Sequence, residues 1–106
     1  MEYSYKDIFN TVKSIIVKTC PFVDTKKIED STLLKRHLSL DNYDIVDIIC
    51  EVEKHYNKFF DIERLEKAHD VGTFCHIVYK ELNRDRKNIK QSNLLNQIKQ
   101  FFTRQN

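Results

Sequence analysis

Residues 31–82 read STLLKRHLSLDNYDIVDIICEVEKHYNKFFDIERLEKAHDVGTFCHIVYKEL, and this stretch decides the fold. Its clearest helical pattern begins after Asp41, whose side chain is suited to cap the first turn of a helix. The residues that follow a helical spacing there are Val46, Ile49, Val52, Glu53 and Tyr56. We therefore expect a helix from about Asn42 to Asn57.

The rest of the stretch predicts one short helix and one long helix. Ile62 and Leu65 lie three residues apart within residues 61–67, which leaves room for only one or two helical turns. Asp70 is a suitable cap for the next helix, which we expect to end near Asn83. The apolar stripe of that helix is Val71, Phe74, Ile77, Val78 and Leu82.

Towards the N-terminus, the pattern predicts a helix from about Ser4 to Lys18, because Ser4 can cap it and Pro21 blocks its continuation. Its apolar stripe is Ile8, Val12, Ile15 and Ile16. Residues 19–40 show no sustained periodicity apart from a candidate helical turn over residues 31–36. We expect the apolar residues of this long connection, Phe22 among them, to pin it across the bundle.

Charge divides the chain into an acidic body and a basic tail. Residues 1–82 hold 12 Lys/Arg and 15 Asp/Glu, net −3, whereas residues 83–106 hold 6 Lys/Arg and 1 Asp, net +5. The tail predicts a basic amphipathic helix over about residues 88–103. Its apolar residues are Ile89, Leu94, Leu95, Ile98, Phe101 and Phe102. We therefore place a bundle over residues 1–83 and a helical extension over residues 84–106.

Composition limits the class of protein. A chain of 106 residues, 41% hydrophobic and 32% charged, can enclose one core and is expected to be globular and soluble. One Gly and one Pro are too few for the turns of a many-stranded sheet, so the chain is expected to be all-α. The three cysteines, Cys20, Cys50 and Cys75, have no CxxC spacing and predict free thiols in a reducing cytoplasm.

Catalytic and metal chemistry find little support in the residue pattern. The four histidines and three cysteines have irregular spacings, so we expect no metal site. No Ser/His/Asp set or glycine-rich phosphate loop stands out, which favours a non-enzymatic protein.

The order of these elements, with a long first connection and an acidic second helix, resembles acyl carrier proteins. The resemblance covers residues 41–82 without a gap and extends back to residue 31, whereas the tail has no counterpart. It implies a four-helix bundle with a short third helix, to which this chain adds a C-terminal amphipathic helix. It also implies a role in fatty-acid, polyketide or similar acyl metabolism.

Carried over residue by residue, the resemblance puts Asn42 at the position of the serine that bears 4′-phosphopantetheine. It puts Asp41 on the preceding Asp, Tyr43 on the following Leu and Asp44 on the next acid. A serine hydroxyl forms the phosphodiester to the prosthetic group, and an amide is too poor a nucleophile to do so. The resemblance thus implies that this chain lacks the prosthetic group.

A second alignment reads Ser39-Leu40-Asp41 as the motif, with Ser39 as the modified residue. This three-residue shift would bring Asp47 onto an inward position and turn Val46 and Ile49 away from the core. Burying an unpaired carboxylate is costly, which disfavours the shift.

The resemblance also implies partners. In the family, the acidic second helix docks enzymes that transfer or process acyl groups; the matching residues here are Asp41, Tyr43, Asp44, Asp47 and Glu51, and Glu53 is a further acid of the same helix. A solvated surface is the alternative interpretation of these charges. Phe59, Phe60, Leu65, Val71 and Phe74 are expected to be core residues.

A different class of function stays open, namely a scaffold or regulator derived from the carrier fold that carries nothing. It would use residues 88–103 to bind a protein partner or a second copy of the chain. A membrane surface is a less favoured partner of this segment. Nucleic acid is not expected, because the body is acidic.

Overall fold

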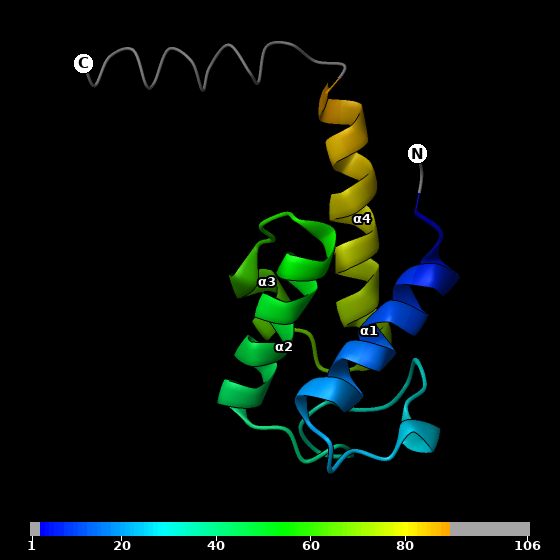
Figure 1. Ribbon diagram of the computed structural model, residues 1–106, viewed down its shortest axis with the longest axis vertical. Coiled ribbons are helices and arrows are strands. Elements are labelled where there is room, and N and C mark those ends of the chain that lie inside the picture. Colours follow the sequence, from blue (N-terminus) through cyan, green and yellow to red (C-terminus); the bar gives the residue numbers. More distant parts are fainter. Residues whose placement is uncertain (1–2, 90–106) are drawn as a thin grey trace, which may run out of the picture.

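The computed structural model describes residues 3–89, with side chains for residues 3–84, and this part of the chain is helical. The elements are α1 (Tyr5–Thr19), the 3-10 helix η1 (Thr25–Lys27), α2 (Asn42–Tyr56), α3 (Ile62–Glu66) and α4 (Val71–Ile89). Figure 1 shows α1, α2 and α4 as the three long helices and α3 as a short one near α2. The expected small helical bundle with a short third helix is confirmed.

Each of the four α-helices in the described part of the chain is preceded by a capping residue, whose side chain accepts a hydrogen bond from a backbone N–H of the first turn. This bond satisfies a donor that the helix itself leaves unpaired. The pairs are Asp7 N to Ser4 Oγ at 3.1 Å, Asp44 N to Asp41 Oδ1 at 2.8 Å, Arg64 N to Asp61 Oδ1 at 3.3 Å and Thr73 N to Asp70 Oδ1 at 2.6 Å. The caps predicted at Ser4, Asp41 and Asp70 are thus confirmed.

The core lies between α1, α2 and α4. The buried residues of the two N-terminal helices are Ile8, Val12 and Ile16 of α1 and Ile45, Ile48, Ile49 and Val52 of α2. The α2 set follows an i, i+3, i+4, i+7 spacing, which puts all four on one helix face. Val46 was expected on this face but is only half-buried, since it lies at the edge of that stripe.

Phe59 corrects another expectation, because its side chain is 87% exposed instead of buried. The reason lies in the turn after α2. Asn57 adopts a left-handed backbone (φ 53°), and the N–H of Phe60 donates to Glu53 Oε2 at 2.9 Å. This turn directs Phe60 into the core and Phe59 to the outside.

The long first connection buries most of its apolar residues in the core, as expected, and backbone hydrogen bonds also join it to the start of α4. Leu34 N donates to His69 O and Val71 N donates to Thr32 O, both at 2.9 Å, and Leu33 forms an isolated antiparallel bridge with Asp70. The N–H of Leu33 itself donates to His37 Nδ1 at 2.9 Å, and its carbonyl oxygen accepts the N–H of His37 at 3.0 Å. Residues 34–38 therefore form hydrogen-bonded turns, and the helical turn predicted over residues 31–36 is wrong.

The end of α4 is a further correction, because the helix runs to Ile89 instead of ending near Asn83. Asn83 bonds within the helix through Nδ2 to Tyr79 O at 3.0 Å, and its amide also pairs with the backbone N–H and carbonyl of Tyr3, each at 3.3 Å. Residues 84–89 contain no Gly or Pro to stop the helix.

The boundary expected between residues 83 and 84 therefore falls inside one continuous helix. The basic helix predicted over residues 88–103 lies, apart from its first two positions, outside the described residues. Within the described part of the chain, no helix has both the length and the apolar character needed to cross a membrane.

Candidate functional site

Asn42 is the first residue of α2, and its side chain is exposed. Asp41 immediately before it caps the helix, and the N–H of Asp41 donates in return to Asp44 Oδ2 at 3.0 Å. This reciprocal pair is a capping box, which fixes the direction in which the chain enters α2. Asn42 is therefore presented at a rigid, acidic helix start.

Ser39, the alternative prosthetic position, lies outside α2. Its backbone is left-handed (φ 59°), and it is exposed between the buried side chains of Leu38 and Leu40. The alignment on Ser39 would require Asp47 to face inward and Ile49 to face outward. In the structure, Asp47 is exposed and Ile49 is fully buried, which agrees with the alignment that puts Asn42 at the helix start.

The five expected docking residues, Asp41, Tyr43, Asp44, Asp47 and Glu51, all come from α2 and its cap; we call them the acidic face. Tyr43 is 82% exposed, and Asp47 is exposed as well. Asp44 and Glu51 are half-buried, and Glu51 forms an ion pair with Lys54 at 3.3 Å. No Lys or Arg lies between Asp41 and Glu53, so every charged residue in this length of the chain is an acid.

The negative charge of this region reaches the end of α1. Burial raises the pKa of the Cys20 thiol, and the nearby carboxylates of Asp44 and Asp47 raise it further. A pocket of about 390 Å³ lies between α1 and α2, where Lys18 and Lys54 line it together with Asp47 and Glu51 of the acidic face. Two lysines therefore lie beside two of the acids of this face.

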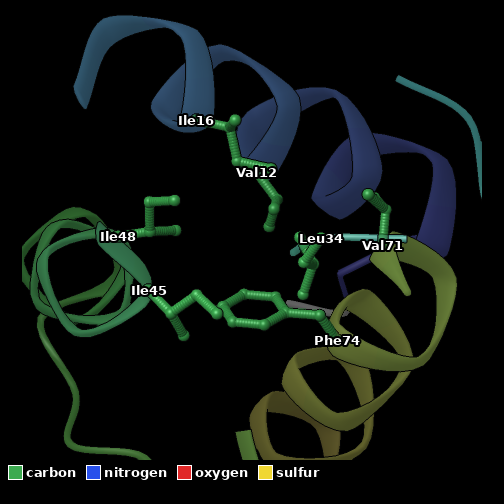
Figure 2. A pocket seen from close by; sticks show the side chains of 7 residues that line it. All are labelled: Val12, Ile16, Leu34, Ile45, Ile48, Val71 and Phe74. Atoms are coloured by element: carbon green, nitrogen blue, oxygen red, sulfur yellow. The ribbon is translucent and has the colours of Figure 1, made fainter. Parts of the chain in front are cut away.

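Behind the acidic face, the bundle interior is filled. Figure 2 shows seven apolar side chains of α1, α2, α4 and the first connection that point toward one another: Val12, Ile16, Leu34, Ile45, Ile48, Val71 and Phe74. The space between them has no room for a water molecule. Val71 and Phe74 are therefore core residues, as expected, and an acyl chain could enter only by displacing packed side chains.

Two roles were missed by the sequence analysis. Glu53 was expected among the docking acids of α2, but its carboxylate accepts the N–H of Phe60 at 2.9 Å, so it has a structural role. Phe22 was expected to pin the first connection and is instead 63% exposed, since it lies in the turn that follows Pro21. The sequence did contain a signal for the exposure of Phe22, because a proline such as Pro21 commonly opens an exposed turn.

The thiols and histidines do not assemble into a centre within the described residues, where no group of three or more potential metal ligands occurs. Cys20 and Cys75 are buried, Cys50 is exposed, and all three are free thiols. Scans of the sequence against protein-family models and against curated proteins found no match.

Proposed function

We propose that this chain is an acyl-carrier-like docking module that presents its acidic face to acyl-transferring or acyl-processing enzymes without carrying 4′-phosphopantetheine. One observation carries the proposal: Asn42 is exposed as the first residue of an acidic, box-capped helix. That is the position at which acyl carrier proteins, which the sequence resembles, keep their modified serine.

The chemistry of Asn42 explains why the chain would not carry 4′-phosphopantetheine. The lone pair of an amide nitrogen is delocalised into the carbonyl, so Asn cannot replace the serine oxygen in a phosphodiester. Asn42 is nevertheless exposed, and the cap of α2 is made by Asp41 and Asp44, so the exchange leaves the shape of the docking region intact. Partner enzymes can therefore recognise the chain although it cannot be loaded with 4′-phosphopantetheine.

The charge of α2 supports the proposed docking of partner enzymes. Along the sequence, no Lys or Arg interrupts the acids of α2 between Asp41 and Glu53, and Tyr43 adds an exposed aromatic ring at the helix start. Such a field speeds encounter with a basic partner surface, and an aromatic residue is a common anchor in interfaces. Association should therefore weaken as salt concentration rises.

Intact-mass measurement of the full chain after co-expression with a phosphopantetheinyl transferase tests the proposal. The wild-type chain should gain no mass, whereas Asn42→Ser should gain one prosthetic group, because the transferase recognises the acidic face and now finds a hydroxyl. Asn42→Ser combined with Ser39→Ala is the matched control and should be loaded equally. Adding Asp47→Lys to Asn42→Ser should slow loading.

Different results would contradict the two claims, namely that the chain lacks the prosthetic group and that its acidic face docks carrier-recognising enzymes. Loading of the wild-type chain, mapped to Ser39 by peptide analysis, would show that the chain carries the group after all. If Asn42→Ser remains unloaded while it keeps the wild-type circular dichroism spectrum, the acidic face is not a carrier surface.

A further inference from the structure

A second feature shares no residue with the acidic face: two segments that carry basic side chains border a pocket of about 480 Å³. The lining residues are Leu33, Lys35, Arg36, Glu66, Lys67, Ala68 and His69, and we call this the basic pocket. Lys35 and Arg36 come from the first connection, whereas Lys67 and His69 come from the segment between α3 and α4. All four of these side chains are exposed and accessible to a ligand.

The two walls are held together by backbone contacts. Leu34 N donates to His69 O at 2.9 Å, and Leu33 pairs with Asp70 in an antiparallel bridge. Two remote segments therefore meet in a fixed arrangement, and the cations on them are brought together before any ligand arrives. Such preorganisation lowers the entropic cost of binding.

The charge of the pocket is opposite to that of the surrounding body. Residues 1–82 carry a net charge of −3, yet the pocket lining holds Lys35, Arg36 and Lys67 against the single carboxylate of Glu66. Within residues 3–84, no hydrogen bond or ion pair involves the side chain of Lys35 or Arg36. Lys67 Nζ lies 3.6 Å from Glu63 Oε1, and both side chains are largely exposed, so this ion pair is weak.

We propose that the basic pocket binds the phosphate group of a small molecule. A guanidinium can hold two phosphate oxygens at once, and two ammonium groups add charge around the same anion. The α4 N-terminus does not contribute, because the first three N–H groups of the helix bond to Thr32 O, Asp30 O and Asp70 Oδ1. Side-chain cations therefore carry this site.

The shape of the pocket distinguishes between two sources of phosphate. A concave site with Leu33 and Ala68 in its wall fits a free phosphate ester with an apolar part better than the flat array of headgroups on a membrane. The inference is independent of the proposed docking function, since none of the residues of the basic pocket belongs to the acidic face.

Amide chemical-shift titration of the full chain with inorganic phosphate, and then with phenyl phosphate, tests the proposal. Saturable shifts at residues 33–36 and 66–69 are expected, with phenyl phosphate binding more tightly. Lys35→Gln with Arg36→Gln should weaken binding about tenfold or more. Lys26→Gln with Lys27→Gln removes the same charge from the exposed η1 and should bind like the wild-type chain.

Three results would overturn the proposal. The first is a shift that chloride reproduces at equal ionic strength, which is simple screening. The second is an equal loss of binding in the Lys26/Lys27 control. The third is binding only to phosphatidylcholine vesicles that contain phosphatidic acid, which would indicate a membrane contact. Lys67→Gln, which leaves the first connection unchanged, serves if the double variant is unfolded.

Discussion

Tyr5 donates a hydrogen bond from its phenolic hydroxyl to Asp30 Oδ1 at 2.8 Å, across 25 positions of sequence. The backbone carbonyl of the same Asp30 accepts the N–H of Gly72 at 2.8 Å. Asp30 therefore joins α1, the first connection and α4 at one point. Several properties of the protein should depend on this junction.

Tyr5→Phe removes the hydrogen bond and should lower the free energy of unfolding by about 0.5–1.5 kcal/mol at neutral pH. The larger consequence is a change in pH dependence. Burial, with a smaller contribution from the hydrogen bond to Asp30, raises the pKa of Tyr5 above its ordinary value of 10.0. The folded state thus holds this proton more tightly than the unfolded state does.

The stability that Tyr5 contributes should therefore be complete below about pH 10 and decline as the pH rises above it. Urea unfolding at about pH 8 and about pH 11 should show a smaller decline for Tyr5→Phe than for the wild-type chain. Tyr43→Phe removes a phenol from an exposed position and serves as the control. An equal decline in all three proteins would contradict the prediction.

Gly72→Ala should destabilise the fold by about 1–3 kcal/mol, although alanine is the better helix former by about 1 kcal/mol. A Cβ at this position would lie 2.9 Å from the carbonyl oxygen of Asp30 and 3.2 Å from its Cβ, so the backbone of the junction must move. Urea unfolding measures the difference. Ser14→Ala, on the exposed side of α1, should stay within about 0.5 kcal/mol of the wild-type value.

Asp41→Ala and Asp47→Asn separate the two uses of acidic residues on α2. Asp41→Ala removes the helix cap and should cost about 1 kcal/mol in thermal or urea unfolding. Asp47→Asn removes one exposed charge and should leave stability within about 0.5 kcal/mol. If Asp47→Asn were as destabilising as the loss of the cap, Asp47 would be a structural residue instead of part of a docking surface.

Phe59→Ala and Phe60→Ala should differ sharply despite their adjacent positions. Phe60 is 6% exposed and packs in the core, so its truncation should cost about 3–5 kcal/mol. Phe59, at 87% exposed, should cost less than about 0.5 kcal/mol. Comparable losses of stability from the two variants would show that Phe59 packs against the bundle.

Much of the helical framework could be read from the sequence because the interactions that define it are local. The caps at Ser4, Asp41 and Asp70 each bond a residue three positions later, and the apolar stripes repeat within four residues. Of the candidate site, the position of Asn42 at the start of α2 and the run of acids in that helix followed from the same local rules.

The remaining features depended on partners that no local pattern shows. The burial of Phe60 instead of Phe59 depends on Glu53, seven positions earlier, and on the left-handed backbone of Asn57. Asn83 is a plausible helix end by sequence but is an interior helical residue here, paired with Tyr3 across 80 positions.

The basic pocket is the clearest case, because Arg36 and Lys67 lie 31 positions apart and are neighbours only through the pairing of Leu33 and Leu34 with residues 69 and 70. The sequence by itself determined the helices, their caps and the acidic face, since each rests on interactions within about two helical turns. Only the structure decided which aromatic ring is buried, because that depends on the left-handed turn at Asn57 and its bond to Glu53, and which cations meet, because that depends on contacts between remote segments.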